Sequence, residues 1–291
     1  MSAFLLKLIA LVSMVTDHTA AVLVPGGLSY FWMRSFGRMA FLIYAFLLSE
    51  GFRHTRSVPR YARRLFLMGA LSQIPYAFTL NAGFQSILER FTHLNIFFTL
   101  GCGVLLMMFL AGPRLSLAEQ RGWKWGLVPL GLLFAVFGQF GVWELPYILT
   151  GLLVIAALGL FLRDRLPFEA GSVVDWALKT AAALALYQLV HNWCERLFSI
   201  GVEFDYSFWA LLFFALLWPC RTRLHRAGAM AAFLLIFYPP WYGLEEFAFA
   251  LLAGVLVVCY NGKRGPDDHR LFYWAYPAHL AVLWGLQTVL K

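Results

Sequence analysis

Long apolar runs separated by short polar connections make up most of this chain. Runs of this length are typical of helices that cross, or nearly cross, a lipid bilayer. The eleven runs lie at residues 4–24, 36–52, 62–80, 94–111, 126–141, 146–162, 173–192, 206–219, 227–242, 244–261 and 271–290. The pattern therefore predicts an all-α fold, a polytopic transmembrane helical bundle of about 10–11 helices.

No long linker separates the runs, so residues 1–291 are expected to form a single integral-membrane domain. The region 238–261 is the least regular, because Pro239-Pro240 and Glu245-Glu246 interrupt its apolar pattern. A short re-entrant turn at these residues is one interpretation, and two ordinary helices are the other.

Basic residues fall in every second connection, which predicts that these connections are cytoplasmic. They are Arg53, Arg56, Arg60, Arg63, Arg64, Arg114, Arg121, Lys124, Arg163, Arg165, Arg221, Arg223, Arg226, Lys263, Arg264 and Arg270. The alternate connections carry acidic residues with few bases, which suits the outer face: Glu89, Glu144, Glu195, Glu203, Asp205, Glu245 and Glu246. We therefore expect a cytoplasmic N-terminus and an outer C-terminus.

Composition supports a membrane protein and argues against a nucleic-acid partner. The chain is 61% hydrophobic and 13% charged, which is too apolar for a soluble domain of 291 residues. Its net charge of +8 is explained by the basic connections. The four scattered cysteines suit neither a metal site nor a disulfide framework, and apolar packing is their expected role. The first run lacks a basic region ahead of it and contains Asp17-His18, so we expect a retained helix and not a signal peptide.

Three ionisable residues, Lys7, Asp17 and His18, lie in the first apolar run. Such groups are costly in hydrocarbon and often mark a functional site. Lys7 and His18 are eleven positions apart, so they share one helix face at a separation of about 16 Å. His18 is a candidate general base, with a hydrogen-bonded packing histidine as the alternative. Asp17 points elsewhere and is expected to meet another helix, with Arg38 as a candidate counter-ion.

The second run opens with Arg34 and Arg38 on one face and ends at Glu50. Arg38 is a candidate for binding an anion or Asp17, although both arginines also suit anchors at the outer interface. Glu50 is expected to have a structural role, held by Arg53 or His54.

A cluster of arginines follows Pro59: Arg60, Arg63 and Arg64 share one helix face near a predicted helix start. Guanidinium groups and free N–H donors at such a position favour phosphate, so a nucleotide-bearing cofactor fits here. The competing interpretation is the positive-inside signal together with contacts to lipid headgroups.

Further polar residues near the spans are candidates for substrate binding. Gln73 and Tyr76 flank a proline in ALSQIPY, and His93 and Asn95 open the run THLNIFFTLG, where helix capping by Thr92 is an equally good explanation. Tyr276 and His279 lie in FYWAYPAHL, where His279 is positioned to join His18. Two histidines without an acidic residue at ligand spacing do not indicate a metal, so none is expected.

Four segments resemble the TraX-like family of conjugal-transfer proteins. They are LKLIALVSMVTDH (6–18), GRMAFLIYAFLLSEGFRHTRSVPRYARRLFLMGALSQIPY (37–76), HLNIFFTLG (93–101) and FYWAYPAHL (272–280). The spacing of Lys7 and His18 is also similar to the Arg…His pair of the acyltransferase-3 membrane enzymes, although this chain has lysine in place of arginine. The middle of the chain is similar only in hydropathy.

The resemblance implies a membrane acetyltransferase that uses cytoplasmic acetyl-CoA and modifies an amine or hydroxyl at the outer face, such as a pilin N-terminus or a cell-envelope glycan. It implies a multi-pass protein of the bacterial inner membrane, surrounded by lipid. In this hypothesis Arg60, Arg63 and Arg64, with Arg53 and His54 nearby, hold the cofactor phosphates. Lys7 orients the thioester, and His18 removes the acceptor proton with help from Asp17 and Arg38.

Two other functions stay open from the residues alone. A proton-coupled transporter or lipid flippase would use Asp17, His18 and His279 as a relay, although no internal repeat accompanies them. An assembly factor without chemistry is the third hypothesis.

Overall fold

The computed structural model describes residues 1–113, 203–237, 243–266 and 269–290, and between them residues 175–177, 179–184, 186, 187 and 190. The described chain is mostly helical. The runs predicted at 126–141 and 146–162, and much of the run at 173–192, lie outside the described residues.

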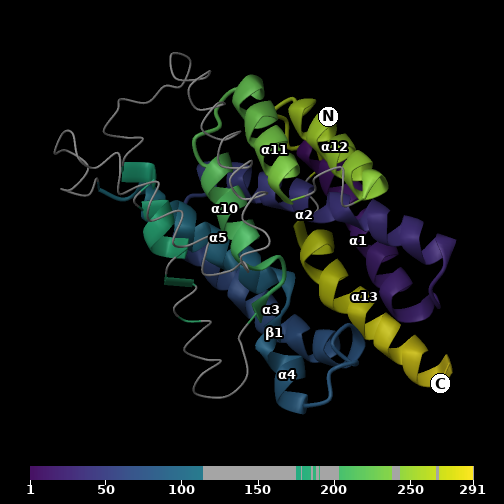
Figure 1. Ribbon diagram of the computed structural model, residues 1–291. Coiled ribbons are helices and arrows are strands. Elements are labelled where there is room, and N and C mark those ends of the chain that lie inside the picture. The colour runs from purple at the N-terminus through teal and green to yellow at the C-terminus, as the bar shows by residue number, and fades with distance from the viewer. Residues whose placement is uncertain are drawn as a thin grey trace, which may run out of the picture.

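Nine helices and two short strands have defined bounds in the described chain. The helices are α1 (Ala3–Leu23), α2 (Leu28–His54), α3 (Val58–Thr79), α4 (Ile87–Thr92), α5 (Ile96–Ala111), α10 (Ser207–Leu217), α11 (Arg223–Phe237), α12 (Leu244–Val258) and α13 (His269–Leu290). The strands β1 (His93–Leu94) and β2 (Glu203–Phe204) pair in parallel, with His93 opposite Glu203. Figure 1 shows the helices packed side by side, with α4 and β1 at one end of the bundle.

Local sequence signals explain several helix starts. The Ser2 side chain accepts a hydrogen bond from the Leu5 N–H at the start of α1, and Asn95 does the same for Phe97 in α5. Ser86 and Glu89 form a capping box on α4. Pro59 lies in the first turn of α3, where its missing N–H costs nothing.

Two helices, α1 and α2, are long and apolar enough to cross a membrane by length and composition, and both lie near the N-terminus. Two shorter apolar helices, Ile96–Ala111 and Phe208–Leu217, fall below that length. Each predicted run in the described chain outside 173–192 coincides with a helix, although α2 begins at Leu28, before the run at 36–52, and the short helix α4 was not predicted. The full bundle of membrane-crossing helices stays a prediction.

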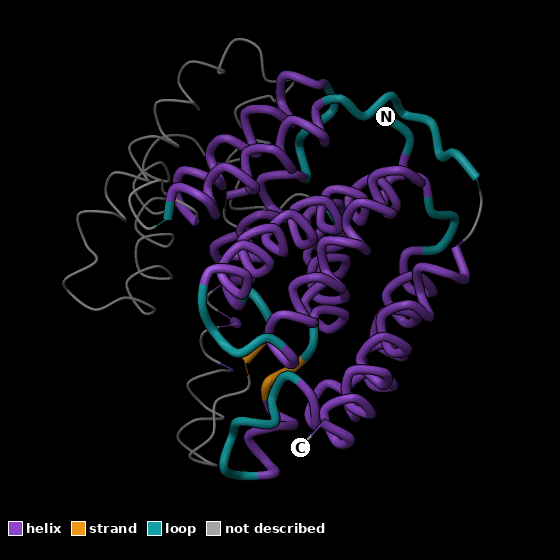
Figure 2. Tube along the Cα trace, turned by 90° about the vertical axis from the view of Figure 1, so that its right-hand side faces the viewer, coloured by secondary structure: helices purple, strands orange, loops and turns teal. Residues whose placement is uncertain are grey.

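Contacts between distant segments gather the basic connections at one end of the bundle, called here the basic end. Arg53, at the end of α2, donates to the carbonyl oxygens of Leu217 and Trp218, where α10 ends. The N–H of Asn261, after α12, donates to the carbonyl of Met1. The N-terminus lies at the basic end, and Figures 1 and 2 show the C-terminus at the opposite end of the bundle.

Helix α2 lies at the centre and packs against α1, α12, α5 and α10. Its buried side chains include Phe41, Leu42, Ile43 and Phe46. Phe41 stacks on Tyr206 with ring centroids 4.1 Å apart, so the centre of α2 is tied to the turn before α10. The apolar core thus surrounds the helix that also carries Arg34 and Arg38.

Of the two interpretations of region 238–261, the structure supports ordinary helices at Glu245 and Glu246, which lie in the first turn of α12. Carboxylates there are stabilised by the positive end of the helix dipole. Pro239 and Pro240 lie outside the described residues. Packing as the role of the cysteines holds for buried Cys220, whereas Cys259 is exposed.

Candidate functional site

A cavity of about 670 Å³ opens among the helices on the side of the bundle away from the basic end. Five helices, α1, α2, α3, α5 and α13, contribute to its wall, as do the start of α12, the end of α11 and the turn before α10. Its polar lining consists of Asp17, His18, Arg34, Arg38, Tyr44, Tyr76, Asn81, Asp205, Tyr206, Glu246 and Tyr276. A volume of this size is typical of sites for small molecules.

His18 is buried on the cavity wall, and its Nδ1 lies 2.7 Å from Nε2 of His279. The Nδ1 atom of His279 lies 2.9 Å from the carbonyl oxygen of Ala275, to which it must donate. In a neutral pair, His279 Nε2 is then the acceptor and His18 Nδ1 the donor. This arrangement leaves Nε2 of His18 as an unprotonated base, and no described hydrogen bond occupies that atom.

Two ion pairs hold the charges beside His18. Arg34 Nη1 lies 2.8 Å from Asp17 Oδ2, and Arg38 Nη2 lies 3.3 Å from Glu246 Oε1. The expected partner of Asp17 was Arg38, and the structure places Arg34 there instead. Arg34 is one turn earlier on α2, on the same helix face, so the spacing alone did not distinguish the two arginines.

A close approach of α1 and α2 brings Asp17 against the second helix. A Cβ added to Gly37 would overlap the Asp17 side chain, so only glycine permits this contact. Small residues allow helices to pack closely where apolar surroundings supply little other driving force. Ser13 strengthens the contact by donating to the carbonyl oxygen of Phe36 at 2.8 Å.

Tyrosines and one carboxylate complete the wall. Tyr76 and Tyr276 are buried, and the Tyr276 hydroxyl has no hydrogen-bond partner among the described residues. Tyr206 adopts a left-handed backbone with a φ of 64°, which is rare for a non-glycine residue and is found mostly at constrained sites. Burial, followed by the negative charge of Asp17, raises the pKa of Asp205 to about 6.

Three predicted substrate-binding residues lie away from the cavity, in a network that supports the fold. The Gln73 amide donates to the carbonyl of His93 at 2.8 Å and accepts from the Asn95 side chain at 2.8 Å. Asn95 caps α5, a role that the sequence had assigned to Thr92. His93 stacks on Phe84 with ring centroids 4.2 Å apart. These groups connect α3 to the start of α5, and none of the three is among the described residues that line the cavity.

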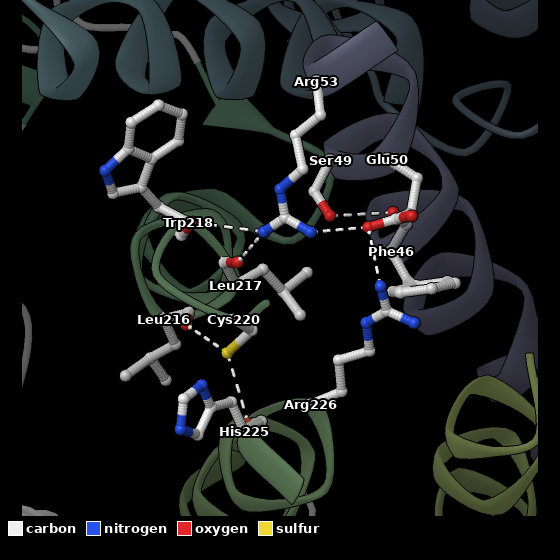
Figure 3. Close-up of polar contacts among 10 residues, drawn as sticks. All are labelled: Phe46, Ser49, Glu50, Arg53, Leu216, Leu217, Trp218, Cys220, His225 and Arg226. Carbon is white, nitrogen blue, oxygen red and sulfur yellow. Dashed lines mark hydrogen bonds and ion pairs between the residues drawn. The ribbon is translucent and has the colours of Figure 1, made fainter. Parts of the chain in front are cut away.

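Arg53, predicted to bind cofactor, is instead engaged at the basic end in a buried cluster shown in Figure 3. Its guanidinium pairs with Glu50 at 2.5 Å, and Arg226 of α11 approaches the same carboxylate oxygen at 3.2 Å. With its bonds to the carbonyls of Leu217 and Trp218, Arg53 joins the ends of α2 and α10. The structural role predicted for Glu50 is confirmed. Both terminal nitrogens of Arg53 are engaged within the protein, and its buried Nε has no partner among the described residues.

The remaining candidates lie at the basic end. Arg60, Arg63 and Arg64 are exposed in the first two turns of α3, and His54 is exposed at the end of α2. Lys7 lies with its ammonium 5.3 Å from the centroid of the Phe272 ring. The Phe272 ring lines the cavity, so Lys7 lies behind one of its walls.

The structure therefore brings together His18, Asp17, Arg38, Tyr76, Tyr276 and His279, and it separates them from the other predicted residues. The sequence analysis assigned no site role to Tyr206, the first residue of the run 206–219, or to Asp205 and Glu246, which it placed in outer connections. Their acidic character on that side of the membrane was the only signal, and it did not show that they face a cavity.

Comparison with known proteins gives one family. The model of the family described as "TraX protein" matches residues 2–194 and 172–287. A "Probable fimbrial assembly protein FimC, serogroup H1" of Dichelobacter nodosus is 36% identical over 122 residues, which are 40% of this chain. The alignment covers 48% of that relative, so this chain spans about half of its length. No solved structure matches. Because the family model covers most of the sequence, this chain belongs to the TraX family.

Proposed function

We propose that this protein is an integral-membrane acetyltransferase that moves an acetyl group from cytoplasmic acetyl-CoA to an amine or hydroxyl acceptor at the outer face. Membership of the TraX family and the name of the fimbrial relative support a pilin or fimbrial acceptor, with a cell-envelope glycan as the other acceptor class. Two apolar helices near the N-terminus support a membrane location, and the proposed location is the bacterial inner membrane with multiple spans.

One observation carries the proposal: His18 is on the cavity wall with its Nδ1 engaged by His279 and its Nε2 unoccupied among the described residues. A histidine whose other nitrogen is fixed in this way is suited to act as a general base. Asp17 is paired with Arg34 and Arg38 with Glu246, so the neighbouring ion pairs place little net charge beside the imidazole.

The transfer step balances with groups of this chain. Nε2 of His18 takes the proton from the acceptor, the acceptor atom attacks the thioester carbonyl, and the carbon–sulfur bond breaks. The proton on His18 then passes to the departing thiolate. An alternative with the same atoms forms acetyl-histidine first, because imidazole also serves as a nucleophile.

The donor is proposed to approach from the basic end. Arg60, Arg63 and Arg64 are exposed there at the start of α3, where guanidinium groups and free N–H donors favour phosphates. Acidic groups, Asp205 and Glu246, lie on the opposite side of the cavity, where an outer acceptor would enter.

The test is acetyl transfer by purified protein in detergent, with radiolabelled acetyl-CoA and two acceptors, a synthetic pilin N-terminal peptide and a cell-envelope glycan. Replacement of His18 by glutamine should lower the transfer rate by about 10²–10⁴-fold, as expected for loss of a general base. Thr288→Ala is the control, because Thr288 is exposed near the end of α13 and is not among the residues that line the cavity. Unchanged transfer by His18→Gln would eliminate the proposal.

A proton-coupled transporter is the second candidate, and the short contact between His18 and His279 favours it. Two imidazoles in hydrogen-bond contact beside a cavity also form a proton relay. Uptake by proteoliposomes under a pH gradient, abolished by His279→Ala and accompanied by no turnover of acetyl-CoA, would reverse the ranking.

A further inference from the structure

The seam between α1 and α13 runs from the contact of His18 with His279 beside the cavity to the contact of Phe4 with Phe272 nearer the basic end. His18 and His279 meet in this seam, and Phe272 of α13 lies seven residues before His279. Seven residues make almost two helical turns, so Phe272 and His279 share one face of α13 about 10 Å apart. Phe272 therefore lies nearer the start of α13 and the basic end than the proposed base, and its ring forms part of the cavity wall.

Aromatic and cationic contacts hold the Phe272 ring in that place. The ring meets Phe4 edge-to-face, with centroids 5.8 Å apart, and the Lys7 ammonium lies 5.3 Å from its centroid. Phe272 is half-buried, with the cavity on one side and the start of α1 on the other.

A basic segment is bonded to the start of α1, the part of that helix which contacts this ring. The N–H groups of Ala3 and Phe4 donate to the carbonyl oxygens of Lys263 and Arg264, each at 2.9 Å. Gly265 has a φ of 78°, and a Cβ there would come within 2.9 Å of the Phe4 Cβ. The segment is thus fixed against α1 by its backbone, and the side chains of Lys263 and Arg264 are exposed beside the seam.

We propose that this seam is the access route for the acyl thioester, with the Phe272 ring as the gate before His18. Lys263 and Arg264 then give the donor phosphates a second set of contacts, in addition to the arginines at the start of α3. The proposal rests on the proposed acetyltransferase function and extends it by naming the route and residues that admit the donor. Charge complementarity supports this occupant, because two exposed cations lie on the segment that is bonded to the start of α1. Phe272, which α1 contacts there, lines the cavity that holds the proposed base. A coenzyme that has phosphates at one end and an uncharged thioester arm at the other fits this arrangement of exposed cations and buried base.

Cysteine protection tests the route directly. Phe272→Cys is placed in a background in which Cys102, Cys194, Cys220 and Cys259 are replaced by serine or alanine, and its alkylation by a maleimide is timed. Acetyl-CoA at about ten times its Kd should slow alkylation about tenfold, because it occupies the site in most molecules. Leu271→Cys is the matched control, since Leu271 is the neighbouring residue, is 44% exposed and should be alkylated at the same rate with and without donor.

Binding of labelled acetyl-CoA to the same preparations separates the two proposals. Donor binding without protection of Phe272→Cys would overturn the route and leave the acetyltransferase proposal standing. Absence of donor binding by the wild-type protein would overturn both. Equal protection of Phe272→Cys by phosphatidylglycerol alone would identify the region of Lys263 and Arg264 as a lipid headgroup site and would also overturn the route.

Variants of the wild-type protein that remove the two cations or enlarge the Phe272 ring test the proposal if the cysteine-free protein does not fold. Lys263→Gln/Arg264→Gln should weaken acetyl-CoA binding by about tenfold or more, as expected for lost charge-assisted contacts, and should leave turnover of S-acetylpantetheine, which lacks the nucleotide phosphates, unchanged. Arg221→Gln, an exposed arginine elsewhere at the basic end, is the control. Phe272→Trp should raise KM for both donors, and equal KM values for wild type and Phe272→Trp would contradict the gate.

Discussion

His18 of α1 and His279 of α13 share one hydrogen bond, 2.7 Å long, across 261 residues of sequence. The carbonyl oxygen of Ala275 fixes the proton on the far nitrogen of His279. The protonation pattern of the cavity histidine is therefore set by a different helix, and by a backbone carbonyl that no substitution of a side chain removes.

Replacement of His279 tests this dependence. His279→Ala should lower kcat by roughly ten- to a hundredfold, as loss of an orienting partner does for other functional histidines. His279→Gln should recover part of the rate, because its amide oxygen accepts the same hydrogen bond from His18. The measurement is kcat against pH for acetyl transfer. A glutamine variant no better than alanine would show that the bond from His18 is unimportant.

The Asp17–Arg34 ion pair should contribute to stability. Arg34→Gln removes a charge-assisted bond from a partly buried carboxylate, so the free energy of unfolding should fall by about 1–3 kcal/mol. Asp17→Asn/Arg34→Gln should lose less than the sum of the single variants, because no charge is left unpaired. Unfolding in mixed micelles measures both. Additive losses would mean that the two groups do not interact.

Gly37 should be intolerant of any side chain. Gly37→Ala places a methyl group into the Asp17 side chain, and the overpacking should cost about 1–3 kcal/mol and lower acetyl transfer. Gly285→Ala is the matched control on α13, because a Cβ there meets nothing within 4 Å. That control should be neutral or slightly stabilising. Thermal unfolding of the two variants compares them, and similar losses would contradict the close approach of α1 and α2.

Glu50 should be among the most sensitive positions at the basic end. Glu50→Gln leaves Arg53 and Arg226 buried without their shared carboxylate, and breaking a buried ion pair in this way costs about 3–5 kcal/mol. Glu245→Gln serves as the control, since Glu245 lies in the first turn of α12 and has no ion pair among the described contacts. A small change in the melting temperature of Glu50→Gln would show that the cluster contributes little.

Asp205 should make stability depend on pH between about 4 and 6. Its pKa is raised from 3.8 to about 6 by burial, so the folded protein binds the proton more tightly than the unfolded chain. The protonated group favours the fold below pH 3.8, and this contribution is lost as pH rises through 6. Wild type should therefore lose stability relative to Asp205→Asn over that window, as measured by unfolding at each pH. Parallel pH curves would contradict the raised pKa.

The amino-acid sequence by itself determined where most described helices lie, because long apolar runs bounded by Ser2, Pro59 and Asn95 permit few other arrangements. It also identified His18 and Asp17, since ionisable groups stand out against an apolar background. The sequence places basic residues in every second connection, and the described basic connections do lie together at one end of the bundle.

Only the tertiary structure decided which polar residues meet. Arg34 and Arg38 share one face of α2, and helix packing at Gly37 chose Arg34 for Asp17. Gln73 resembles a site residue in sequence, yet its amide bonds the backbone groups of His93 and Asn95 before α5. Asp205 and His279 reach the neighbourhood of His18 from far along the chain. Local patterns carry the periodicity that makes a helix, whereas contacts between helices depend on side-chain volumes at the interface, which no single segment contains.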